Sequence, residues 1–109
     1  MKRLLLIALF ISVGFSQQLA KVVETYENGN IKSITSHKET RNRIEKVKYV
    51  EYYENGEKKK EATYKDGKMH GFANSWHENG QKRYEETYKD GELISEKCWD
   101  EDGNEKDCN

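Results

Sequence analysis

The sequence predicts an all-β protein, an elongated single-layer antiparallel β-meander built from hairpin repeats of 23–24 residues. Glycine turns recur at near-constant spacing, because Gly56 to Gly80 and Gly67 to Gly91 are each 24 residues and Gly80 to Gly103 is 23. The segments between the turns are rich in Tyr, Val, Thr, Trp and Phe, and have the roughly six to nine residues of a strand. Proline is absent and only 34% of the 109 residues are apolar, which fits a thin sheet better than a thick core with buried helices.

The N-terminal segment resembles a secretory signal peptide. Lys2 and Arg3 precede the apolar run Leu4–Ile11, and the small residues Gly14 and Ser16 follow it. The run is too short for a spanning helix, which needs roughly 20 apolar residues. We therefore predict a signal peptide over residues 1–16, cleavage after Ser16, a β-repeat domain over residues 17–109 and a secreted or periplasmic location.

The turns follow two alternating signatures. One is an aromatic residue, acidic residues and Asn-Gly or Asp-Gly, as in Tyr53–Gly56; the other is Thr-Tyr-Lys-Asp-Gly, at Thr63–Gly67 and Thr87–Gly91. Both favour tight hairpins, because Asn, Asp and Gly tolerate positive φ. The predicted turn glycines are Gly29, Gly56, Gly67, Gly80, Gly91 and Gly103.

The first unit departs from the period, since Gly29 to Gly56 is 27 residues with no Asp-Gly between them. We predict strands at Ile31–Ser36 and Lys46–Tyr53. Between them, the polar segment His37–Glu45 is predicted to be either a longer hairpin loop or an irregular excursion. With the later units, this gives about eight short strands in residues 17–109.

Alternation gives each later strand one apolar side: Ala62 shares a face with Tyr64, and Phe72 with Trp76. The aromatic residues that recur with the repeat are predicted to stack along one face and form the thin core. The alternative is a row of exposed aromatics that binds a peptide, a glycan or a partner protein. A non-repeating exposed aromatic would be a better site candidate than such a row, and Tyr49, Tyr53 and Phe72 are of this kind. The repeat aromatics are Tyr26, Tyr52, Tyr64, Trp76, Tyr88 and Trp99.

Cys98 and Cys108 are the two cysteines, and both lie in the predicted exported part. An even number of cysteines in an oxidising compartment indicates a disulfide. Closing a loop of about ten residues contributes roughly 2.8 kcal/mol in the chain-entropy model. We predict a cross-strand link around the Asp102-Gly103 turn.

No catalytic, metal or cofactor site is predicted. His70 and His77 lie near opposite ends of one short strand, roughly 23 Å apart, so we interpret them as turn or surface residues. Neither Ser75 nor Ser95 has a nucleophile motif, and the glycines belong to hairpins and not to a phosphate-binding loop. The sequence thus predicts a protein that is not an enzyme.

Charge also limits the class of partner. Residues 17–109 hold 17 Lys and Arg against 20 Asp and Glu, a net charge of −3, which gives no general attraction to nucleic acid. The basic segments Lys38–Lys48 and Lys58–Lys60 leave contact with a membrane or envelope surface as a weaker alternative.

The alternation of Tyr/Trp-x-x-Asn-Gly with Tyr-x-x-Gly, together with Gly67-Lys68-Met69-His70-Gly71, resembles the variant MORN repeat. The resemblance covers Thr25 to Gly103. The variant MORN repeat is found in bacterial proteins, including the group labelled YwqK-type antitoxins. The resemblance implies an elongated antiparallel sheet that serves as a protein-interaction surface, and the antitoxin label implies neutralising a toxin by binding. The sequence departs from the pattern in its irregular first unit, in Glu92–Ser95 lacking a second glycine, and in its predicted export signal.

Two function hypotheses of different kinds follow. The first is an exported non-enzymatic module that binds another macromolecule, most simply a protein. The second is an antitoxin or immunity-like inhibitor, which rests on the resemblance alone.

Overall fold

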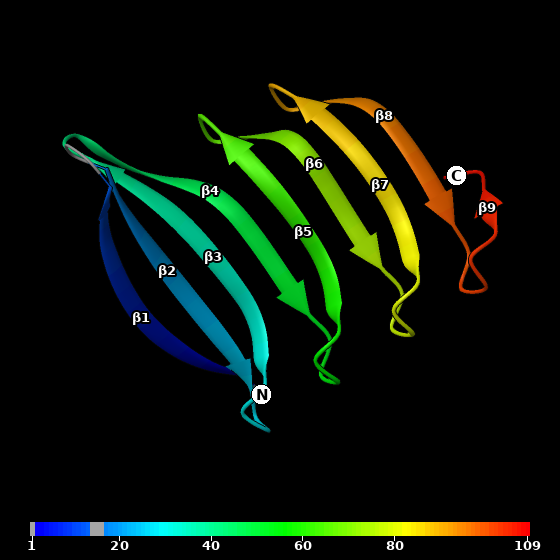
Figure 1. Ribbon diagram of the computed structural model, residues 1–109, viewed down its shortest axis with the longest axis horizontal. Helices are drawn as coiled ribbons and strands as arrows, with labels where there is room; N and C mark the ends of the chain where they lie inside the picture. The colour runs from blue at the N-terminus through cyan, green and yellow to red at the C-terminus, as the bar shows by residue number, and fades with distance from the viewer. Residues whose placement is uncertain (1, 14–16) are drawn as a thin grey trace.

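The computed structural model describes residues 2–13 and 17–109, which form one open antiparallel sheet in which each strand pairs with the next along the chain (Figure 1). The side chains of residues 19–109 are placed, and the predicted cleavage site lies among residues 14–16, outside the described part. The strands are β1 Lys2–Val13, β2 Gln17–Tyr26, β3 Ile31–Thr40, β4 Arg43–Tyr52, β5 Lys58–Lys65, β6 Lys68–Trp76, β7 Lys82–Lys89, β8 Glu92–Trp99 and β9 Glu105–Lys106.

The predicted meander is confirmed. The sheet order runs from β1 to β9 without a crossover, and β2 to β9 are the eight strands expected in residues 17–109. The strands bend and the sheet twists (Figure 1). The molecule measures 46 × 37 × 21 Å along its principal axes. Within the described ranges, no helix is long and apolar enough to cross a membrane. The segment predicted as a signal peptide contains β1, which pairs with β2. Its removal stays a prediction.

The first unit differs from the sequence prediction. Strand β3 continues to Thr40 and β4 begins at Arg43, with Thr40 paired to Arg43. The polar segment His37–Glu45 is therefore neither a longer loop nor an irregular excursion: most of it is strand, joined by a two-residue turn. The 27-residue spacing arises because β3 and β4 have 10 residues each, whereas β5 has 8 and β6 has 9.

Small residues form the centre of the sheet. The buried apolar side chains are Val50, Ala62 and Ala73, at 8%, 6% and 4% exposure, and Ser33 and Ser75 are also buried. The recurring aromatics are half-buried. The prediction that they form the core along one face is wrong, because alternation along each strand puts Tyr52 and Trp76 on the face opposite Tyr88. An open sheet has no second layer to cover large rings.

Candidate functional site

The two faces of the sheet differ in chemistry, because directly paired residues of antiparallel strands point to the same side. We call one side the alanine face. It consists of two rows of paired residues that cross β3 to β8. They are Tyr49–Ala62–Ala73–Glu86–Glu96 and Ser33–Glu51–Lys60–Ser75–Tyr84–Cys98.

The alanine face has a buried floor and taller flanks. Ala62, Ala73 and Ser75 are 6% exposed or less, whereas Tyr49 and Tyr84 beside them are half-buried. The small side chains in the middle of the sheet are almost entirely covered by larger neighbouring side chains. The larger side chains on either side keep part of their own surface in solvent.

Hydrogen bonds to carboxylates fix two tyrosines on this side of the sheet, Tyr49 and Tyr88. Tyr49 Oη donates to Glu51 Oε1 at 3.2 Å, and Tyr88 Oη, two residues beyond Glu86 on β7, donates to Glu86 Oε1 at 3.1 Å. Ser33 Oγ donates to Glu24 Oε1 at 3.1 Å. Burial, and secondarily the charges of Glu51 and Glu24, raises the pKa of Tyr49 to about 12. Burial and the bond to Glu86 raise the pKa of Tyr88.

Alkali should therefore weaken the fold between about pH 10 and pH 12. The fold favours the neutral phenol of Tyr49, whose pKa is about 12 here against an ordinary 10. Its stabilisation is complete below pH 10 and is lost as the pH rises towards 12, because the unfolded chain releases the proton first. Urea unfolding followed by tryptophan fluorescence across this range should show a shallower loss for Tyr49→Phe. Glu51→Gln, which removes a neighbouring negative charge, should give an intermediate slope, and slopes equal to wild type would contradict the assignment.

The opposite face carries an alternation of aromatic rings with lysines and glutamates. Lys58 Nζ and Lys82 Nζ each lie 5.5 Å from the centre of the Trp76 ring. The same lysines form ion pairs with Glu61 at 3.3 Å and Glu85 at 2.8 Å. These contacts engage the lysines with neighbouring side chains, and the contact between Lys58 and Trp76 joins two successive strands of the meander.

Successive Asn-Gly loops are linked to one another by side-chain donors. Tyr26 Oη donates to the Tyr52 carbonyl at 2.6 Å, and Tyr53 Oη to the Trp76 carbonyl at 2.8 Å. His77 Nε2 continues the series to the Trp99 carbonyl at 3.0 Å. His77 thus takes the tyrosine's place in its loop, a role that the interpretation as a surface histidine missed.

A second series uses amides. Asn55 Oδ1 accepts the Glu57 N–H at 2.8 Å while its Nδ2 donates to the Glu78 carbonyl at 3.3 Å. In the next loop, Asn79 Oδ1 accepts the Gln81 N–H at 2.9 Å and Nδ2 donates to the Glu101 carbonyl at 2.8 Å. The fourth loop has Asp102 at this position. In the described chain no fifth loop lies beyond it, so position 102 has no loop carbonyl that corresponds to those of Glu78 and Glu101.

This difference gives a matched pair of variants. Asn79→Asp should lower the free energy of unfolding by about 1–2 kcal/mol, because it removes a donor and sets a carboxylate against the Glu101 carbonyl. Asp102→Asn should change it by less than about 0.5 kcal/mol, as for a surface substitution. Urea unfolding of both variants measures the difference. Equal effects would show that the amide series does not stabilise the stacked loops.

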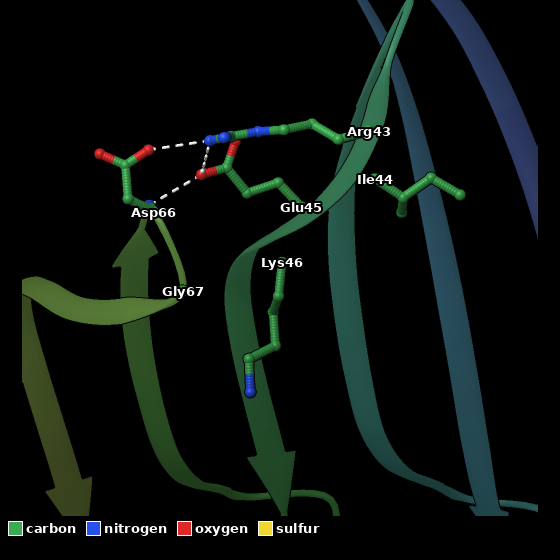
Figure 2. Close-up of a pocket in the computed structure, with 6 residues that line it drawn as sticks. All are labelled: Arg43, Ile44, Glu45, Lys46, Asp66 and Gly67. Atoms are coloured by element: carbon green, nitrogen blue, oxygen red, sulfur yellow. Dashed lines mark hydrogen bonds and ion pairs between the residues drawn. The ribbon is translucent and has the colours of Figure 1, made fainter.

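The Asp-Gly turns at the other end of the strands form a corresponding row. Figure 2 shows Arg43 bridging two carboxylates, with Nη2 3.0 Å from Glu45 Oε1 and 2.9 Å from Asp66 Oδ1. Glu45 Oε1 also accepts the Asp66 N–H at 2.7 Å. The bond from Arg43 lowers the pKa of the Asp66 carboxyl. Each carboxylate here is committed to a turn, so the pocket at this site is an ion-paired loop junction.

The loops repeat the same backbone bonds four times. The residue at position 77 donates to the carbonyl of 81 at 2.8 Å and accepts from the N–H of 80 at 2.9 Å, and the loops at 26–30, 53–57 and 100–104 have equivalent pairs. The family model described as the MORN repeat variant matches residues 47–66 and 69–90. Segment 47–90 therefore carries two MORN-variant repeats. No curated protein and no solved structure matches the chain.

Each MORN-variant repeat runs from one strand through an Asn-Gly loop to the Asp of the next Asp-Gly turn. The loops at 26–30 and 100–104 extend the same geometry beyond the matched segments. All six predicted turn glycines have positive φ, as do Gly71 and the two non-glycine residues Asp66 and Asp90. MORN repeats are generally implicated in binding.

The predicted disulfide is confirmed next to the last loop. The sulfur atoms of Cys98 and Cys108 are 2.07 Å apart and the Cα atoms are 5.2 Å apart.

His70 and His77 lie in different environments, the first beside the Asp90 turn and the second in the loop series. Among the described residues, no group of three or more His, Cys, Asp or Glu is placed to hold a metal ion.

Only some residues of the alanine face were among the candidates predicted from the sequence. Tyr49 was among the predicted exposed aromatics, and it lies on this face. Tyr53 instead holds a loop, and Phe72 is 68% exposed on the opposite face. The buried Ser33, Ala73 and Ser75 were missed. Small residues at equivalent strand positions could have indicated them.

Proposed function

We propose that this chain is an exported, non-enzymatic β-repeat module that binds another protein through the alanine face. The observation that carries the proposal is the floor of small buried residues, flanked by Tyr84 and by Tyr49, whose hydroxyl is held by the Glu51 carboxylate. Isolated sheets of this kind normally bury one face against another element. Tyrosine is enriched at the centres of protein interfaces, and rings already fixed lose little freedom on binding.

Charge defines the expected partner surface. Glu51, Glu86 and Glu96 lie on the alanine face with Lys60. An interface that matches this side of the sheet therefore presents basic and apolar groups. Two of the lysines proposed for membrane contact have partners within the chain: Lys59 pairs with Glu51 at 3.5 Å, and Lys46 lies 4.1 Å from the centre of the Tyr64 ring. These contacts favour a protein partner over an anionic lipid surface.

Adjacent residues on β7 provide the test. A photo-crosslinking amino acid at Glu86 lies on the alanine face, whereas one at Glu85 lies on the opposite face. In the native envelope fraction, the position 86 variant should give a discrete protein adduct that the position 85 variant does not give. Adducts at both positions with equal yield, or at neither, would contradict the proposal. Substrate turnover that a few point mutations abolish would contradict its non-enzymatic part.

Export and the antitoxin alternative have separate tests. N-terminal sequencing of the exported protein should start at Gln17, and a sequence starting at Met1 would exclude cleavage. The antitoxin role follows from the resemblance to the YwqK-type group. Co-expression with the neighbouring gene product should relieve toxicity if that role holds.

A further inference from the structure

The outer edge of β8 is open along most of its length. β9 pairs only with Cys98 and Trp99. From Glu92 to Lys97, every residue of β8 is exposed, and in the described chain no strand lies along that side. Strands β2 to β7 have neighbours on both sides in the described chain. The sheet can therefore add a strand at the outer edge of β8 or at the opposite edge, which is β1, or β2 if residues 1–16 are removed. The charge and apolar surface of the β8 edge indicate what kind of strand it would accept.

The disulfide prevents the chain around β9 from covering this edge. Cys108 is held with its Cα 5.2 Å from that of Cys98. Residues Glu105 to Cys108 are thereby kept at the Trp99 end of β8, away from Glu92. The N–H and C=O groups along the outer edge are available to another chain.

Two negative charges lie side by side next to this edge. Glu86 on β7 and Glu96 on β8 are directly paired on the alanine face, and like charges in directly paired positions destabilise a sheet. On the inner strands, the corresponding pair Glu51 and Lys60 has opposite charges. A Lys or Arg on a strand added beside β8 would sit next to Glu96 and restore the inner pattern.

The edge also exposes apolar surface. Leu93 is 45% exposed, and Ile94, the extra residue at the irregularity between β7 and β8, is 59% exposed. An incoming strand that is both basic and apolar would cover them. A second copy of β8 fits poorly, because it would bring its own Glu92 and Glu96 to the same edge.

We propose that the outer edge of β8, from Glu92 to Lys97, receives an extended segment of the partner protein that places Lys or Arg opposite Glu96. The inference rests on the proposed protein-binding function and specifies how the partner joins the sheet. Backbone hydrogen bonds would provide affinity, and the alternating side chains would provide selectivity. The partner would then continue from the edge across the adjoining alanine face.

Two synthetic peptides of ten residues test the edge, one alternating Val or Thr with Lys and the other with Glu in place of Lys. In fluorescence anisotropy at low salt, the Lys peptide should bind at least ten times more tightly than the Glu peptide. Glu96→Lys should reverse this preference, whereas Glu85→Lys, on the opposite face, should leave it unchanged. Hydrogen exchange should slow at the amides of Ser95 to Lys97 when the Lys peptide is bound.

The failures are distinguishable. Equal binding of both peptides, no binding of either, or protection confined to β4 to β6 would overturn the edge site, and a crosslinked partner at position 86 would still support the protein-binding function. Dimers in analytical ultracentrifugation whose formation protects β8 would assign the edge to a second copy and overturn the proposal. Loss of both the crosslink and the peptide binding would reject the function together with the edge.

Discussion

Replacing Gly71 with alanine should lower the free energy of unfolding by about 2–3 kcal/mol, the largest effect that we expect from a single methyl group in this chain. Gly71 has a φ of +92°, which side chains rarely adopt. An added Cβ would also lie 2.7 Å from Thr63 Oγ1. That hydroxyl cannot move away freely, because it donates to the His70 carbonyl. Urea unfolding followed by tryptophan fluorescence measures the change.

Gly67→Ala is the matched control. Gly67 has a φ of +79°, and an added Cβ meets no atom within 4 Å, so the substitution should cost about 1–2 kcal/mol for the backbone alone. In a Thr63→Ala background, Gly71→Ala should fall to the cost of Gly67→Ala. If Gly71→Ala costs no more than Gly67→Ala in the wild-type background, the contact with Thr63 is not a constraint.

Local signals explain which parts of the fold were predictable. Asp66-Gly67 and Asp90-Gly91 set their turns through backbone preferences of two residues, so the period predicts them. Arg41-Asn42 lacks glycine, and the polar residues around it resemble a loop. Thr40 pairs with Arg43, and Glu45 accepts a hydrogen bond from the Asp66 N–H in the next turn. Both contacts depend on neighbouring strands, so no pattern within the segment predicts them.

The alanine face was less predictable for a related reason. Ser33 is 1% exposed although serine is usually a surface residue. Its direct partners on the two neighbouring strands are Glu24 and Glu51, and its hydroxyl donates to Glu24. Equally, His77 stands for a tyrosine only because its ring reaches the Trp99 carbonyl of the next loop. Such roles depend on how closely successive repeats lie in the folded sheet, and this distance cannot be predicted from the residue types alone.

Removing the Cys98–Cys108 disulfide should have a large but local effect. The chain-entropy model assigns roughly 2.8 kcal/mol to closing a loop of this length. β9 makes only two pairs with β8, so without the link this short strand should detach. Strands β2 to β8 keep all their own pairs, and the urea midpoint of the main transition should therefore shift little. The expected result for Cys98→Ser/Cys108→Ser is fast hydrogen exchange at Glu105 and Lys106 with unchanged protection in β4 to β7.

Intact mass provides the control, since reduction of the wild-type protein should add about 2 Da if the bridge is present. The double serine variant should not respond to reductant. It should also bind the Lys peptide at least as tightly as wild type, because loss of β9 extends the open edge of β8 to Trp99. The opposite result would be a fall in hydrogen-exchange protection throughout β4 to β8. It would show that the disulfide stabilises the whole sheet, and that β9 is coupled to the sheet more tightly than its two pairs with β8 indicate. A rise in dimer content would identify the covered end of β8 as a barrier to self-association, because exposed edges are where sheets join.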